Sequence, residues 1–183
     1  MTARGLAVLA AAALLGACSS AGGAQEPDDP EGYSRHQADG HSFLYADGWE
    51  RQPGEESGVV EFLGPEGTGD IRTGVRAQRG PGLPDDVPMD VYLDQFHLNA
   101  DLQLQDREVI SEDPVEVAGA QDAMLVESRY VVPLEDDDVP MRQFDLLVLT
   151  DDGASVNLRA AGPADDVDEN VLRTIVDSLR LQA

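Results

Sequence analysis

Hydrophobic and polar residues alternate along much of the chain after residue 42, as expected for β-strands with two different faces. Between Ile71 and Gln78, the side chains of Val75 and Ala77 alternate with those of Arg76 and its polar neighbours. One face of this strand is therefore expected in the core, and the other in water or against a partner. The same pattern predicts short strands at Phe43–Tyr45 and Val59–Leu63, two short strands between Leu102 and Val117 divided by Asp113-Pro114, and a long strand at Ala123–Val132.

The clearest hairpin joins Met141–Thr150 to Ala154–Ala161 through a loop that ends at Gly153. A three-residue loop with Gly153 in the left-handed region keeps one face of both strands apolar, whereas a two-residue loop sets Leu146 against Arg159. The three-residue loop is therefore favoured. It predicts the cross-strand pairs Leu146–Leu158, Val148–Val156 and Asp145–Arg159.

Two segments carry apolar residues at the spacings of three and four that are typical of amphipathic helices. The first follows a cap at Asp85 or Asp86, and the second follows a cap at Asp165 or Asp166. Since the strands follow one another in hairpins, we expect an α+β domain over residues 42–183, with an antiparallel sheet of about seven strands flanked by two helices. The helical stripes are Met89, Tyr92, Leu93, Phe96 and Ala100, and Val171, Leu172, Ile175, Val176 and Leu179.

The N-terminal segment has the pattern of an export signal that ends at the single cysteine. Arg4 precedes an apolar run from Leu6 to Leu15, and the small residues Gly16 and Ala17 stand directly before Cys18. This resembles the bacterial lipobox, which predicts removal of residues 1–17 and a diacylglyceryl anchor on Cys18. An ordinary cleaved signal or a short buried helix are the alternatives, because the run is shorter than the roughly 20 residues of a membrane-spanning helix. Residues 18–41 are then expected to be a flexible acidic tether.

The charge of the chain limits its partners. Twelve basic residues, all arginine, face 36 acidic ones and give a formal net charge of −24. Removal of residues 1–17 takes away only Arg4, so the mature chain carries one positive charge fewer. Nucleic acid and anionic lipid headgroups would both be repelled. We therefore expect the protein on the extracytoplasmic face of the cell membrane, held by its acyl chains and facing an envelope protein or other envelope component.

Candidate metal ligands are few. His36 and His41 form a conceivable weak metal pair, although a solvated linker suits their surroundings better. His97 is expected at the boundary of a helix. The run Glu135–Asp138 gathers four carboxylates but lacks the spaced ligands and glycine of a calcium loop, so a solvated hairpin loop is favoured. The sequence therefore predicts no metal and no cofactor.

Catalytic motifs are also missing. Neither Gly-x-Ser-x-Gly nor His-Glu-x-x-His occurs, and lipidation would consume the thiol of Cys18. A hydrolase needs a nucleophile activated by a nearby base. We therefore expect a protein without catalytic residues, and keep a hydrolase as the weaker alternative.

Three features resemble one family. They are the aromatic strand Phe43–Tyr45 before Gly48-Trp49, Gly119 before the long strand, and the apolar C-terminal helix around Val171–Leu179. Together they resemble the LpqN/LpqT family of actinobacterial lipoproteins, which has a PsbP-like (Mog-type) fold. The resemblance covers most of residues 42–181. It implies a non-enzymatic envelope protein that binds or assists a partner, and it carries no catalytic residues.

One set of polar residues is the candidate binding surface, because strand alternation places them away from the main apolar side. The leading hypothesis is a binding or accessory module that uses this surface. Two alternatives remain: the same residues form ion pairs within the sheet, or a small apolar or lipid ligand occupies a groove between the C-terminal helix and the sheet. The candidate residues are Arg72, Arg76, Glu127, Arg129, Asp145, Asn157 and Arg159.

Overall fold

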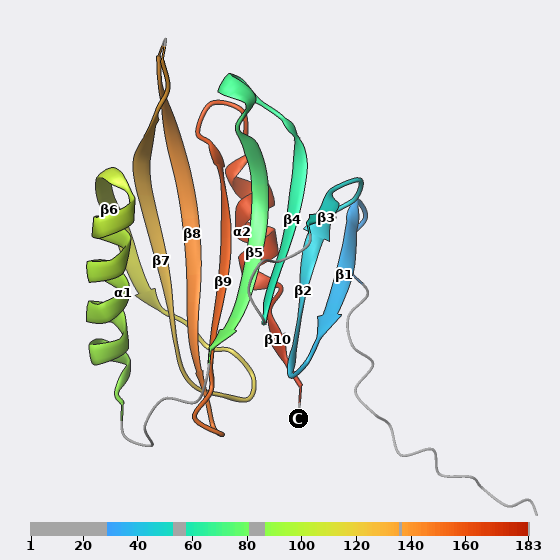
Figure 1. Ribbon diagram of the computed structural model, residues 1–183. Coiled ribbons are helices and arrows are strands. Elements are labelled where there is room, and N and C mark those ends of the chain that lie inside the picture. Colours follow the sequence, from blue (N-terminus) through green and yellow to red (C-terminus); the bar gives the residue numbers. More distant parts are fainter. Residues whose placement is uncertain (1–28, 53–57, 81–86, 136, 183) are drawn as a thin grey trace, which may run out of the picture.

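A seven-stranded antiparallel sheet forms the body of the computed structural model, which describes residues 29–52, 58–80, 87–135 and 137–182 (Figure 1). The predicted α+β class and antiparallel sheet are confirmed. In spatial order the strands are β3 (Glu50–Gln52), β4 (Val59–Glu66), β5 (Arg72–Gly80), β9 (Ser155–Pro163), β8 (Asp138–Thr150), β7 (Ala120–Pro133) and β6 (Gln105–Pro114).

Two helices and a smaller sheet complete the described chain. The small sheet has the order β1-β2-β10. Its strands are β1 (Tyr33–Ala38), β2 (His41–Ala46) and β10 (Arg180–Leu181); the helices are α1 (Met89–Gln103) and α2 (Glu169–Asp177), and a short 3-10 turn spans Thr68–Asp70.

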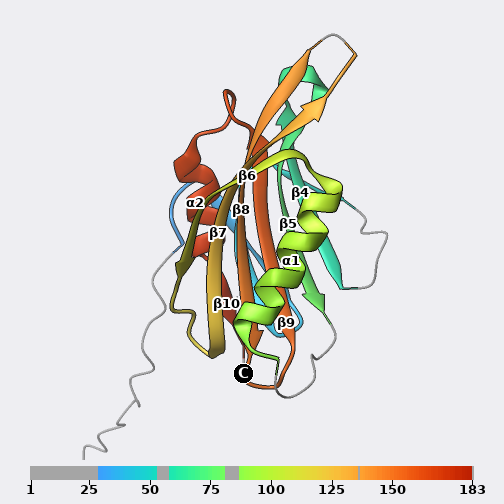
Figure 2. The ribbon, with the colours of Figure 1, turned by 90° about the vertical axis from the view of Figure 1, so that its left-hand side faces the viewer.

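The two helices lie on opposite faces of the large sheet. Phe144 and Leu146 of β8 pack in one cluster with the apolar residues of α2, whereas Leu147 packs in another with Phe96 of α1. Successive side chains of a strand point to opposite faces, so the sheet lies between the helices. Figure 2 looks onto α1, which lies in front of the sheet.

The main core lies between the large sheet, α2 and the small sheet. Phe144, Leu158, Leu172 and Phe43 are all fully buried there. Burial of each large apolar side chain contributes about 1.5–3 kcal/mol. The predicted apolar stripe of α2 is therefore used in packing, and its contact with the sheet is filled by side chains.

The second face of the sheet is covered only in part. Phe96 of α1 packs with Val126 of β7 and Leu147 of β8. Towards β5 and β9 the same face carries polar residues, among them Arg76 and Arg159. Helix α1 therefore packs on the apolar part of this face, over β7 and β8, and a cleft lies between the helix and the polar part, over β5 and β9.

The hairpin β8–β9 has the predicted register. Leu146 pairs with Leu158, Val148 with Val156, and Asp145 with Arg159. Gly153 has φ +79°, in the left-handed region that a three-residue loop of this kind requires.

Other predictions need correction. The segment between Leu102 and Val117 forms one strand, β6, and not two. Pro114 does not divide it, because the proline ends an outer strand of the sheet, where a missing N–H is tolerated. The N-cap of α2 is Asp168, whose Oδ1 accepts a hydrogen bond from the Asn170 backbone N–H at 2.9 Å, rather than Asp165 or Asp166. Asp85 and Asp86 lie outside the described residues, and α1 begins after Pro88.

The predicted tether is wrong at its C-terminal end. Residues Tyr33–Ala38 form β1, and His41 begins β2 with 3% of its surface exposed. His36 packs between the rings of Phe43 and Phe62, at centroid distances of 5.4 and 5.3 Å. These histidines are therefore packed against aromatic rings and not solvated. The stretch escaped prediction because β1 buries little apolar surface of its own.

Cys18 and the rest of the predicted signal lie outside the described residues. Among the helices that the structure describes, none is long and apolar enough to cross a membrane.

Candidate functional site

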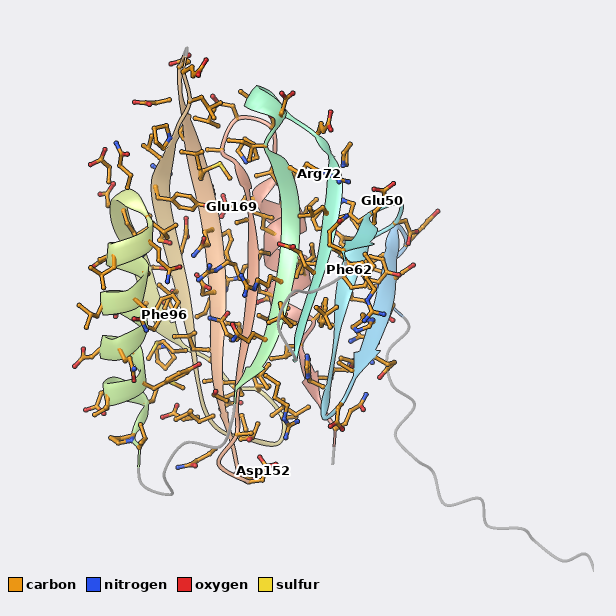
Figure 3. All side chains as sticks on the ribbon, in the orientation of Figure 1. Glu50, Phe62, Arg72, Phe96, Asp152 and Glu169 are labelled. Carbon is orange, nitrogen blue, oxygen red and sulfur yellow. The ribbon has the colours of Figure 1, made fainter. Side chains whose placement is uncertain are left out.

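A polar cleft of about 560 Å³ lies between α1 and the uncovered part of the large sheet. Strands β5 and β9 supply its floor, and α1 supplies its wall; Phe96 reaches from α1 toward the sheet (Figure 3). The floor residues are Arg76, Gln78, Gly80, Ser155, Asn157 and Arg159, and the wall residues are Tyr92, Gln95, Phe96, Asn99 and Gln103.

A row of charges crosses the floor. Strand pairing aligns Glu61 with Arg76, Arg76 with Arg159, and Arg159 with Asp145. Two guanidinium groups are therefore direct neighbours, with a carboxylate at each end of the row. This arrangement concentrates positive charge at the centre of the floor.

Asp145 fixes the position of Arg159. Its side chain is fully buried, and its Oδ1 accepts a hydrogen bond from Arg159 Nε at 2.8 Å. Its Oδ2 accepts a second bond from Gln143 Nε2 at 2.5 Å. A buried carboxylate is tolerated only when it is paired in this way. Arg159 is thus fixed through its Nε, while 31% of its side chain stays exposed and lines the cleft.

Two tyrosines beside this pair keep their hydroxyl protons. Burial raises the pKa of Tyr92, and the negative charge of Asp145 raises it further against the opposing effect of a hydrogen bond with Ser155. Burial also raises the pKa of Tyr130, with Arg159 acting in the opposite direction. Tyr92 therefore lines the cleft as a neutral phenol.

The lining favours ligands that offer hydrogen-bond acceptors. It holds two guanidinium groups, five carboxamides and no carboxylate, in a protein with 36 acidic residues. Asn157 Oδ1 is buried without a hydrogen-bond partner among the described residues. Leaving a buried acceptor unpaired costs about 1–3 kcal/mol, so an acceptor-rich ligand would also gain from one hydrogen-bond donor placed at Asn157.

The residues of the predicted binding surface do not all lie on one face of the sheet. Asp145, Asn157, Arg76 and Arg159 share the face that forms the cleft floor, as strand pairing requires. Arg72 lies further along β5 toward the sheet edge, where its guanidinium is 3.3 Å from the carboxylate of Glu50 (Figure 3).

Glu127 and Arg129 belong to the opposite face, and their inclusion was wrong. Glu127 pairs across the strands with Phe144 of the main core, and Arg129 with Arg142. Arg142 makes ion pairs with Glu127 at 2.6 Å and with Glu169 of α2 at 2.7 Å. Around Glu127 both faces of β7 are buried, whereas Arg129 is exposed. Alternation alone therefore could not show which face of this strand is open to solvent. The alternative of ion pairs within the sheet therefore holds for Glu127 with Arg142 and for Asp145 with Arg159.

His97 lies at the boundary of α1, as predicted. Its Nε2 is 3.0 Å from Glu112 Oε1 of β6, and its Nδ1 is 3.0 Å from a guanidinium nitrogen of Arg107. These contacts tie α1 to the outer strand, on the side of the helix away from the cleft.

The wall of the cleft was missed in the sequence. Gln95, Asn99 and Gln103 recur at every fourth position of α1, which places them on one side of the helix. That spacing of carboxamides was a signal available in the sequence. Tyr92, predicted in the apolar stripe, packs against the cluster around Phe96 and also lines the cleft.

Candidate metal sites receive no support within the described residues. No group of three or more His, Cys, Asp or Glu side chains there has a geometry that could hold a metal ion. Asp136, within the acidic run Glu135–Asp138, lies outside the described residues.

The layered arrangement defines a PsbP-like fold of the LpqN type, as the resemblance implied. A solution structure of cyanobacterial PsbP (CyanoP) from Synechocystis sp. PCC 6803 is similar, with a TM-score of 0.61 and 19% identity over 92% of this chain and 99% of that chain. The crystal structure of LpqN of Mycobacterium tuberculosis, described as involved in cell envelope biogenesis, has a TM-score of 0.54 and 12% identity over 82% of this chain and 92% of that chain. A scan against protein-family models finds no match, and neither does a comparison with curated protein sequences.

Proposed function

We propose that this protein is a lipid-anchored, extracytoplasmic binding module that holds a polar envelope component in the cleft beside α1. The observation that carries the proposal is the lining of that cleft. Arg76 and Arg159 sit side by side among carboxamides, and no carboxylate is among the lining residues, although the chain has a net charge of −24. Such a lining supports binding of a ligand rich in hydrogen-bond acceptors.

An envelope location is supported by two observations. The segment Leu15–Cys18 has the lipobox pattern, and one similar solved structure is a protein involved in cell envelope biogenesis. In this proposal a diacylglyceryl group on Cys18 supplies two acyl chains, which is what stable anchoring needs.

A non-catalytic role is supported by the chemistry of the cleft. None of its lining residues is His, Cys, Asp or Glu, so no general base lies among them. Ser155 and Tyr92 are the lining hydroxyl groups, and burial raises the pKa of Tyr92 further above its ordinary value. We therefore expect no turnover by the full chain on a panel of esterase and peptidase substrates. Turnover that is abolished in His97→Ala would contradict a purely binding role.

Photo-crosslinking in the producing cell tests the proposed site. A benzophenone amino acid replaces Gln95 in the cleft wall or, as the control, Glu31, which is exposed two residues before β1. Strand β1 and helix α1 lie on opposite sides of the molecule (Figure 1). We expect a defined adduct from position 95 that is absent from position 31. The adduct should decrease when Arg76→Gln is combined with the probe at position 95. Equal adducts from both positions, or no effect of Arg76→Gln, would contradict the proposal.

A further inference from the structure

The outer side of α1 carries an exposed apolar stripe that the cleft does not use. Val91, Leu98 and Leu102 are 51, 63 and 78% exposed. At about 100° per residue they lie on one side of the helix, opposite the buried Met89, Phe96 and Ala100. Leu98 and Leu102 are one helical turn apart, and exposed apolar side chains that form a patch, unlike single ones, mark interaction surfaces.

Charge is distributed unevenly beside this stripe. Asp90, Asp94 and Asp101 lie along one flank, and the carboxamides of the cleft wall lie along the other. The acidic flank continues onto β6, the outer strand beside α1 (Figures 1 and 2), where Glu112 is exposed and pairs with Val126, which packs with Phe96 of α1.

Among the described residues, positive charge is paired with this flank at Asp101. Helix α1 contains neither lysine nor arginine. Arg107 of β6 is nearby, but only 2% of its side chain is exposed and it already pairs with Asp101 at 2.7 Å. The surface beside the stripe is therefore acidic toward any molecule that approaches it.

That charge decides between occupants. An anionic lipid surface would be repelled by the acidic flank. A second copy of the chain would bring together two molecules with a net charge of −24 each. A protein segment with its own apolar stripe and flanking basic residues would gain from both apolar burial and charge attraction.

We propose that the outer side of α1, defined by Val91, Asp94, Leu98 and Leu102, docks a basic amphipathic helix of a partner protein. The apolar stripe of the partner packs on Leu98 and Leu102, and its basic residues face the acidic flank. This surface does not overlap the residues that line the cleft, so it does not depend on the proposed function.

A titration of the full chain with a synthetic peptide tests the proposal. The probe is an 18-residue helix with a leucine stripe and flanking arginines, and its control has the same composition in a scrambled order that breaks the stripe. We expect the striped peptide to bind at least tenfold more tightly than the scrambled one. Leu98→Ser with Leu102→Ser should remove about tenfold of that affinity, since two exposed leucines no longer become buried. Circular dichroism of the variant checks that α1 is retained.

A matched pair of charge variants separates this site from general attraction to an acidic protein. Asp94→Asn should weaken binding of the striped peptide and reduce its dependence on salt, whereas Glu31→Gln, which removes the same charge two residues before β1, should not. Equal binding of both peptides, or wild-type binding by the serine variant, would overturn the proposal. Self-association of the chain that is abolished by Leu98→Ser would also overturn it. So would flotation of a Cys18→Ser chain with phosphatidylglycerol vesicles, if flotation were lost when Leu98→Ser and Leu102→Ser are added.

Discussion

Asp145 is the residue on which the floor of the cleft depends most directly. It is fully buried, and its partner Arg159 remains 31% exposed. Loss of the arginine would leave an unpaired buried charge, whereas loss of the carboxylate would leave a guanidinium that can still reach water. The two halves of this pair are therefore energetically unequal.

We expect Arg159→Gln to lower the free energy of unfolding by about 3–5 kcal/mol, and Asp145→Asn by about 1–3 kcal/mol. Urea denaturation measures both. Glu50→Gln is the control, because Glu50 pairs with Arg72 while 72% exposed, and exposed pairs contribute about 0–1 kcal/mol. A smaller loss for Arg159→Gln than for Asp145→Asn would show that the carboxylate is not the dependent partner.

The lowered pKa values of two histidines in the small sheet predict a stability that depends on pH. Burial is the main cause that lowers the pKa of His41 and of His36 from the ordinary 6.5, and Arg51 adds to the effect on His36. The unfolded chain then binds more protons than the folded protein once the pH falls below about 6.5. The stabilising effect is complete above that pH and is lost as the pH falls toward the lowered values.

We therefore expect a lower urea midpoint at pH 5.5 than at pH 7.5, followed by the fluorescence of Trp49. In His36→Gln with His41→Gln the difference between the two pH values should shrink. An unchanged difference in the double variant would assign the pH dependence to other groups.

At the scale of elements, strands were predicted best where only one register places the apolar residues of two neighbouring strands on the same face. The β8–β9 hairpin is the clearest case, since only one register pairs Leu146 with Leu158 and Val148 with Val156. Strand β1 was missed because its polar sequence is paired through the backbone to β2 and carries little apolar pattern. The carboxamide wall was missed because the prediction for α1 used only its apolar stripe. The polar residues beside that stripe divide into an acidic flank and a carboxamide flank, which the apolar spacing does not distinguish.

Gly153 is the element-scale position where backbone conformation matters most for that hairpin. Its φ of +79° is unfavourable for any residue with a side chain. We expect Gly153→Ala to cost about 1–2 kcal/mol, visible as a lower melting temperature. Asp151→Ala in the same exposed loop is the control and should stay within about 0.5 kcal/mol of wild type. Equal stability of both variants would argue against the assigned loop conformation.

On the scale of the whole molecule, the proposed anchor and the described domain have separate tasks. Acyl chains on Cys18 would fix the position, and the cleft would provide the binding chemistry. We expect metabolic labelling with palmitate to mark the wild-type chain and not Cys18→Ser, and the variant to leave the membrane fraction. Membrane retention of an unlabelled Cys18→Ser chain would contradict anchoring through this cysteine.

The central claim, that the cleft is occupied in the envelope, is tested most directly by arginine footprinting. The chain has twelve arginines and no lysine. Phenylglyoxal modifies arginine side chains, and mass spectrometry then measures the rate of modification at each of them. We predict that Arg76 and Arg159 react several-fold more slowly in intact envelopes than in the purified protein, while the exposed Arg51 reacts equally in both. Equal rates for all three arginines in both preparations would contradict the account.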